Sequence, residues 1–60
     1  MRRRVVVWGN TVYIQVEQKS QFVWVARGEY LGNLIQVEDS TAATASRRWR
    51  DIATSKDNER

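Results

Sequence analysis

Hydrophobic and polar residues alternate along most of the first 38 residues, and short polar or Gly-containing segments interrupt the alternation. Gly9-Asn10 and Gly32-Asn33 each separate two runs of β-branched and aromatic residues, which is the pattern of tight hairpin turns. The runs 11–18 and 21–27 are joined by the polar pair Lys19-Ser20, which is compatible with a third turn. The pattern predicts four antiparallel strands in meander order.

The two faces of this sheet follow from pairing across the turns, because opposite residues of an antiparallel pair point to the same side. The predicted register places Val7 opposite Val12 and Arg27 opposite Glu38, with a loop of about three residues around Ser20. The inner, core-forming face is then predicted to consist of Val5, Val7, Val12, Ile14, Val16, Phe22, Trp24, Ala26, Tyr30, Ile35 and Val37.

After Glu38 the hydrophobic period changes to that of a helix. Asp39, Ser40 and Thr41 offer oxygens that can cap a helix N-terminus, and residues 42–54 contain neither Gly nor Pro. The apolar positions of this segment form one helical stripe, which we expect to pack on the sheet: Ala42, Ala45, Trp49, Ile52 and Ala53.

The segment 55–60 has no apolar residue and is predicted to be a flexible tail. The expected architecture is therefore one small α+β domain over residues 1–54, an antiparallel β-meander of three to four strands followed by one C-terminal α-helix packed on one face.

Composition excludes several classes of protein. The chain has 60 residues, is 42% apolar and contains neither Cys nor His, so disulfides, zinc fingers and Cys-ligated clusters are excluded. No nucleophile motif, phosphate loop, dinucleotide fingerprint or calcium loop is present, and Asp39 is interpreted as a cap. We expect no enzyme activity, catalytic residue, metal, cofactor or small-molecule substrate.

The N-terminal segment does not resemble a targeting or membrane-spanning sequence. Three arginines precede an apolar run of only four residues, 5–8, which is too short for a signal peptide or for the roughly 20 residues that cross a bilayer. We therefore expect a cytoplasmic location and no membrane partner.

Basic charge is concentrated near the two ends of the chain, at Arg2, Arg3 and Arg4 and in the predicted helix at Arg47, Arg48 and Arg50. Arginine clusters of this kind suit phosphate groups, and a basic N-terminal arm can reach a nucleic-acid groove. The alternatives are a solvated helix face and an edge strand whose charges discourage aggregation.

The predicted outer face of the sheet is more apolar than a water-facing surface requires, which is typical of an interface. Two interpretations compete. Trp8 and Tyr13 can stack on bases beside Arg4 and Arg27, as in single-strand binders. Alternatively, the aliphatic side chains on this face form the seam of a homodimer: Val6, Val23, Val25 and Leu34.

The strand 22–27, Gly32, Thr41 at the helix start, and Ala42 and Ala45 together resemble the arm-type DNA-binding domain of tyrosine recombinases and the related AP2-type domain. The resemblance is architectural and implies that the sheet enters the major groove while the helix braces it from behind. Gly32 and Thr41 lie farther apart than in those families, and Glu29 and Glu38 add acidic groups to the strands.

These observations predict a small, basic, non-catalytic module that binds nucleic acid. Its expected contacts are the arginines named above, with Trp8 or Tyr13 for stacking. The alternative is a homo-oligomeric or accessory domain that binds another protein through the outer face.

Overall fold

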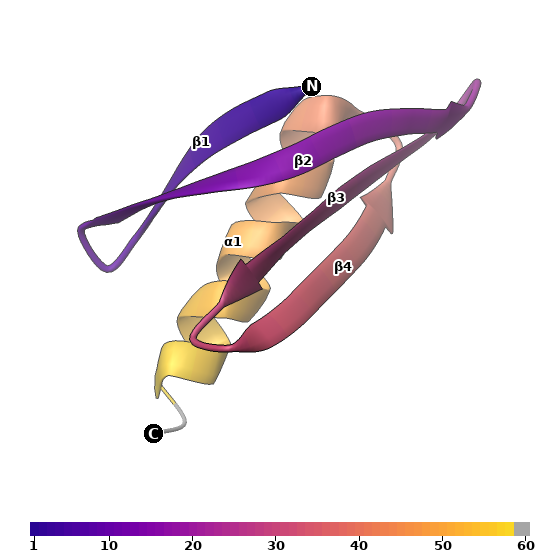
Figure 1. Ribbon diagram of the computed structural model, residues 1–60. Helices are drawn as coiled ribbons and strands as arrows, with labels where there is room; N and C mark the ends of the chain where they lie inside the picture. The colour runs from indigo at the N-terminus through magenta and orange to yellow at the C-terminus, as the bar shows by residue number, and fades with distance from the viewer. Residues whose placement is uncertain (59–60) are drawn as a thin grey trace.

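The computed structural model describes residues 1–58 of the chain, and the side chains of residues 1–56. Four strands, β1 (Arg2–Val7), β2 (Asn10–Ser20), β3 (Val23–Tyr30) and β4 (Asn33–Asp39), precede one helix, α1 (Ala42–Asn58). The strands form a single antiparallel sheet in the order β1-β2-β3-β4, and α1 crosses one face of it (Figure 1). The predicted α+β meander with a C-terminal helix is confirmed.

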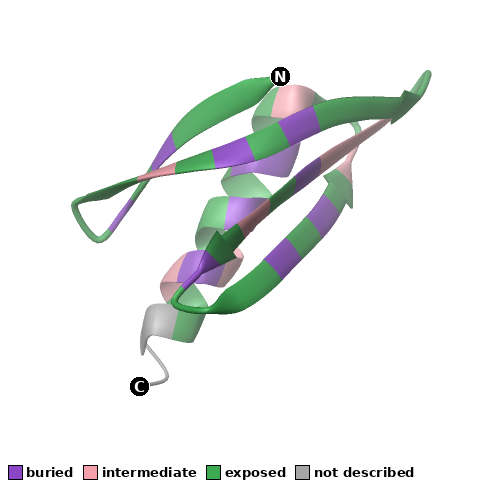
Figure 2. Ribbon diagram, in the orientation of Figure 1, coloured by how far each residue is buried: buried purple, intermediate pink, exposed green. Residues whose placement is uncertain are grey.

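Burial alternates along the strands, so that one face of the sheet is covered by α1 and the other is open (Figure 2). The buried hydrophobic core consists of Val5, Val7, Ile14, Val16, Ala26, Tyr30, Ile35, Val37, Ala45, Trp49 and Ala53. The opposite side, called the outer face below, carries the alternate positions: Arg2, Arg4, Val6, Thr11, Tyr13, Gln15, Glu17, Val23, Val25, Arg27, Glu29, Leu34, Gln36 and Glu38.

The predicted helical stripe packs on the sheet, and Trp49 is its central residue. The Trp49 side chain is fully buried, and its indole N–H donates a 3.0 Å hydrogen bond to the Ile35 carbonyl of β4. Its ring meets the Tyr30 ring edge to face, with centroids 6.4 Å apart and an interplanar angle of 81°. A buried indole needs such a polar partner, so the hydrogen bond sets where α1 lies along β4.

Gly28 makes room for this contact. A Cβ at position 28 would lie 2.8 Å from Ile14 Cγ2 and 3.3 Å from Trp49 Cζ2. Ile14 is buried and β-branched, so its side chain has little freedom to turn away.

We therefore expect Gly28→Ala to destabilise the domain by about 1–3 kcal/mol, because the added methyl overpacks the core. Urea unfolding followed by tryptophan fluorescence measures this loss, and Glu29→Ala on the outer face is the matched control. An unchanged unfolding midpoint for Gly28→Ala would show that Ile14 and Trp49 can move apart at no cost.

The two Gly-containing turns lie one residue earlier than the sequence predicts. Their central residues are Trp8-Gly9 and Leu31-Gly32, all with φ between 50° and 78°. Positive φ at both central residues is the type I′ geometry, whose twist matches the flanking strands. Each predicted register is consequently wrong by two residues, and Val5 rather than Val7 lies opposite Val12. A shift of two leaves the residues that remain within these strands on their predicted faces.

The turn between β2 and β3 also lies later than predicted. β2 continues to Ser20 with a register irregularity after Gln18, and the turn residues are Gln21 and Phe22. Phe22 is therefore at a hairpin tip with 73% of its surface exposed. Its predicted place on the inner face is wrong, because the bulge moves the chain reversal toward Phe22.

Leu31 occupies a left-handed conformation (φ 53°) that costs a bulky L-residue about 1–2 kcal/mol. Because Asn tolerates this conformation and is preferred before Gly in type I′ turns, Leu31→Asn is expected to stabilise the domain by about 1 kcal/mol. Leu34→Asn, which changes an exposed leucine within β4, is the control and is expected to give no gain. Thermal unfolding compares the two variants, and equal effects would exclude turn strain as the cause.

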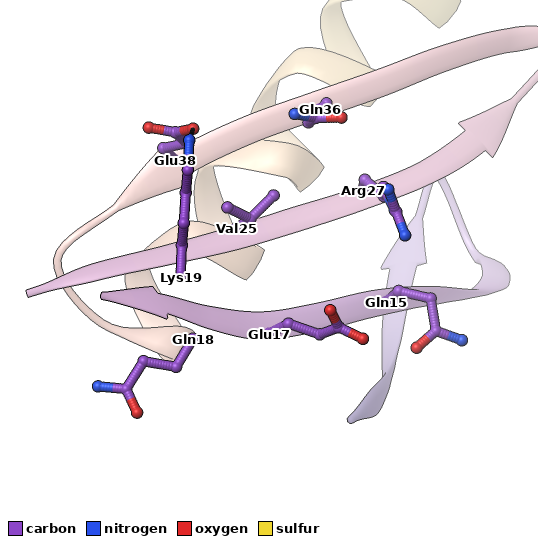
Figure 3. A pocket seen from close by; sticks show the side chains of 8 residues that line it. All are labelled: Gln15, Glu17, Gln18, Lys19, Val25, Arg27, Gln36 and Glu38. Carbon is purple, nitrogen blue, oxygen red and sulfur yellow. Dashed lines mark hydrogen bonds and ion pairs between the residues drawn. The ribbon is translucent and has the colours of Figure 1, made fainter. Parts of the chain in front are cut away.

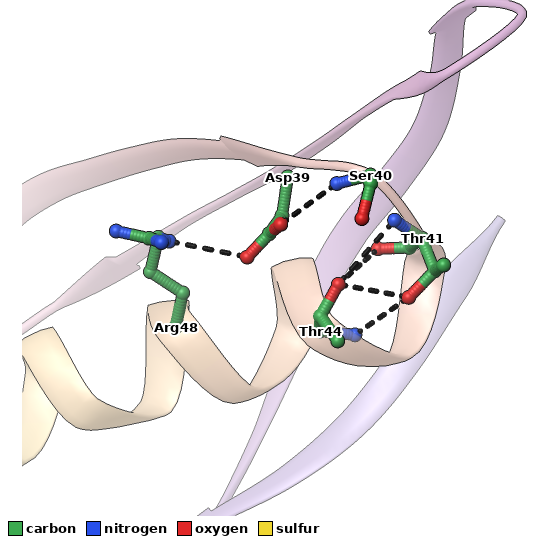
Figure 4. A network of polar contacts seen from close by, with 5 residues as sticks. All are labelled: Asp39, Ser40, Thr41, Thr44 and Arg48. Carbon is green, nitrogen blue, oxygen red and sulfur yellow. Dashed lines mark hydrogen bonds and ion pairs between the residues drawn. The ribbon is translucent and has the colours of Figure 1, made fainter.

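Thr41 is the residue that caps α1. Its Oγ1 accepts a 3.1 Å hydrogen bond from the Thr44 N–H, and its own N–H donates to Thr44 Oγ1 at 3.3 Å (Figure 4), a reciprocal arrangement like a capping box. Asp39 is therefore not the cap.

The helix continues through Asn58, past the predicted end at residue 54 and into the predicted tail. Residues 59–60 of that tail lie outside the described residues.

Candidate nucleic-acid interface

The structure divides the predicted binding residues between opposite sides of the molecule. Arg2, Arg4, Arg27 and Tyr13 lie on the outer face, where all four are exposed. Arg3 is also exposed, but the alternation of β1 directs it to the side of the sheet that α1 covers. The predicted residues of α1 are likewise exposed and lie beyond the inner face: Arg47, Arg48 and Arg50.

The outer face carries a row of directly opposed polar side chains, one from each strand. Arg2 lies opposite Gln15, Gln15 opposite Arg27, and Arg27 opposite Gln36. At the usual spacing of neighbouring strands this row is about 14 Å long. Figure 3 shows its last three members on β2, β3 and β4. We call these four residues the Arg-Gln row.

Gln15 and Gln36 were missed by the sequence-based site prediction. Both residues alternate in phase with their neighbours on the outer face, so the sequence could predict the face on which they lie. It could not predict the residues opposite them, because these depend on the register. The predicted register set Arg27 opposite Glu38 as a charge pair. In the structure Arg27 lies opposite Gln36. Glu38 instead forms an ion pair with Lys19, with 3.1 Å between Lys19 Nζ and Glu38 Oε2.

Tyr13 extends the basic part of this face. The guanidinium carbon of Arg2 lies 5.4 Å from the centroid of the Tyr13 ring, within the range of a cation–π contact. Tyr13 is 60% exposed and lies opposite Arg4 on β1. An exposed aromatic ring between two arginines is suited to stacking on a base while the guanidinium groups contact phosphates.

The aliphatic side chains of the predicted dimer seam are separated by polar neighbours. Val25 lies between Glu17 on β2 and Glu38 on β4, and Leu34 lies opposite Glu29. Val6 is likewise opposite Thr11. The seam of Val6, Val23, Val25 and Leu34 therefore does not present one continuous apolar surface.

Trp8 is not on the outer face beside Tyr13, where the predicted register placed it. It is the first central residue of the β1–β2 turn, and its indole N–H donates a 3.4 Å hydrogen bond to the Thr54 carbonyl of α1. The side chain remains 62% exposed. A base stacked on Trp8 would consequently lie at the turn, away from Tyr13.

The three arginines of α1 differ in their partners. Arg48 donates from Nε to Asp39 Oδ2 at 3.3 Å (Figure 4), whereas Arg50 donates from Nε to the Val6 carbonyl of β1 at 2.9 Å. Among the described residues no ion pair of Arg47 is found. Arg48 is therefore neutralised locally, and the other two retain an uncompensated charge.

The pKa of the Asp39 carboxyl lies below its ordinary value. The main cause is the Ser40 N–H, which donates a 2.8 Å hydrogen bond to Asp39 Oδ1, and the second cause is the hydrogen bond from Arg48. Because the pKa is lowered on folding, the contribution of Asp39 to stability is present above the unfolded pKa of about 4 and is lost as pH falls through the folded pKa.

Asp39→Asn is accordingly expected to reduce the free energy of unfolding at pH 7, and the difference from the parent chain should shrink as pH falls below about 4. Denaturant unfolding across this pH range measures it. Asp51→Asn removes the same charge from α1, where no hydrogen bond or ion pair of Asp51 is found within residues 1–58, and is the control. A difference that stays constant with pH would contradict the role of the ionised carboxylate.

No family model, curated protein or solved structure matches the chain. Within residues 1–58, His, Cys, Asp and Glu side chains do not form a group of three that could hold a metal ion. In the same part of the chain no helix has the length and apolar character needed to span a membrane. A function must therefore be inferred from the chemistry of the surfaces themselves.

Proposed function

We propose that the chain is a non-catalytic module that binds nucleic acid through the outer face of its sheet. The observation that carries this proposal is the Arg-Gln row. Arginine can donate two hydrogen bonds to guanine O6 and N7, and glutamine can pair with adenine N6 and N7. Side chains of these two types, exposed and directly opposed across four strands, suit the edges of stacked bases.

The dimensions of the face are compatible with a duplex groove if the row runs along the groove. The row is about 14 Å long at the usual strand spacing, which is more than the width of about 12 Å of the major groove of B-DNA. This mode is also the one implied by the resemblance to arm-type and AP2-type domains, in which the helix lies behind the sheet. Stacking on Tyr13 beside Arg2 favours unpaired strands instead, so both forms of ligand belong in the test.

Acidic side chains on the same face limit the expected affinity. Glu38 is paired with Lys19, but no ion pair of Glu17 or Glu29 is found among the described residues. Glu17 lies next to the Arg-Gln row, two residues along β2 from Gln15. A carboxylate beside the row repels the phosphate groups of a nucleic acid that is bound there.

The test is fluorescence anisotropy of labelled duplex DNA, single-stranded DNA and RNA, at low and at physiological salt. Arg27→Gln is expected to weaken binding about tenfold or more, as loss of a base-contacting arginine does. Glu17→Gln is expected to strengthen binding, because it removes a repulsive charge. Opposite effects from these two variants are hard to explain by loss of folding, which would weaken binding in both.

Unchanged affinity in Arg27→Gln would contradict the proposal, and so would the absence of binding in all three ligands. A stable dimer in light scattering that Val25→Glu dissociates, together with no nucleic-acid binding, would support the protein-binding alternative instead.

A further inference from the structure

A second basic surface lies at the edge of the sheet, where β1 runs beside α1. It is a shallow groove, called the β1–α1 groove below, and its lining residues are Arg4, Val5, Val6, Ser46, Arg47 and Arg50. Three of these six residues are arginines, and none is acidic. Repulsion between like charges makes such a cluster costly unless solvent or an anion compensates it.

The arginines of the groove are available to a ligand. Arg50 is held in place by its Nε bond to the Val6 carbonyl, which uses one of the five donors of its guanidinium. No ion pair of Arg4 or Arg47 is found among the described residues. Arg48, adjacent to Arg47 in sequence, is outside the groove and is bound to Asp39.

The backbone of β1 adds donors to the same groove. β1 is an edge strand, and the Val6 carbonyl points away from β2, toward Arg50. The Met1 carbonyl accepts a hydrogen bond from the Val16 N–H of β2, so the odd-numbered residues of β1 direct their backbone N–H and C=O groups toward β2. In an antiparallel strand the N–H and C=O of one residue point to the same side. The N–H groups of Arg4 and Val6 therefore face the open edge.

We propose that the β1–α1 groove binds a phosphate group of the nucleic-acid backbone, through the guanidinium groups of Arg4, Arg47 and Arg50 and the edge N–H groups of β1. This inference rests on the proposed function. It extends that function because Arg4 belongs both to the outer face and to the groove. A strand of nucleic acid bound on the outer face would continue over the β1 edge and place a phosphate in the groove.

The decisive comparison is Arg47→Gln against Arg48→Gln. Both variants remove one positive charge from neighbouring positions of α1, but only Arg47 lines the groove. With the nucleic-acid form that binds best, Arg47→Gln is expected to weaken binding several-fold and to reduce the slope of log affinity against log salt by about one. Arg48→Gln should change both quantities much less.

A second measurement locates the anion directly. Inorganic phosphate is titrated into the ¹⁵N-labelled protein, with chloride at equal ionic strength as the control. We expect the amide signals of Arg4 and Val6 and the Nε signal of Arg50 to shift with phosphate in the parent chain, and to shift less in Arg47→Gln. The remaining amide signals show whether each variant is folded.

The outcomes separate the two proposals. If Arg27→Gln weakens nucleic-acid binding but Arg47→Gln and Arg48→Gln behave alike and phosphate leaves the Arg4 and Val6 signals unmoved, the groove proposal is overturned and the proposed function stands. If no nucleic acid binds but phosphate shifts these signals, the proposed function is overturned and a phosphate site in the groove is supported.

Discussion

Trp49 holds α1 on the sheet, because its fully buried indole also donates a hydrogen bond to β4. It is the only one of the three tryptophans that is buried, and removing a buried Trp side chain typically costs about 3–5 kcal/mol. A domain of this size has few other sources of stability, since the chain contains no cysteine that could form a disulfide. The indole that contacts Ile35 and Tyr30 lies close over Gly28, where an added Cβ would be 3.3 Å from the Trp49 ring and 2.8 Å from Ile14. This contact commits one face of the sheet to α1 and leaves the other open.

The open face and the β1–α1 groove are joined by β1, which is why this strand is central to the proposed function. Arg4 contributes to both surfaces, and Arg50 ties the Val6 carbonyl of the edge to the helix. The bond from Arg50 also occupies one backbone acceptor of the exposed β1 edge, which reduces the tendency of this edge to pair with another sheet. Arg48 serves a different purpose, since its bond to Asp39 joins the second turn of α1 to the end of β4.

The register of the sheet decides which charges are free to bind. With the turns predicted at Gly9-Asn10 and Gly32-Asn33, Arg27 would be paired with Glu38 and largely neutralised. With the second turn one residue earlier, Arg27 lies opposite Gln36, and Glu38 forms an ion pair with Lys19 instead. The Arg-Gln row exists only in this second register. Leu31 has a positive φ, which is unfavourable for a bulky residue. This turn conformation is therefore coupled to the composition of the proposed binding face.

The order of elements, the face to which most strand residues point and the stripe by which α1 packs could all be predicted from the amino-acid sequence. These properties follow from the periods of two and 3.6 residues, and a two-residue error in pairing does not alter them. The strand pairs, the places of Trp8 and Phe22 in turns, and the groove that Arg4 lines together with residues of α1 became visible only in the folded chain. The strand pairs and the turn residues depend on which positions adopt a positive φ, which the hydrophobic periods do not reveal. The groove depends on where the bond from Trp49 to Ile35 sets the helix, and that bond joins residues far apart in the chain.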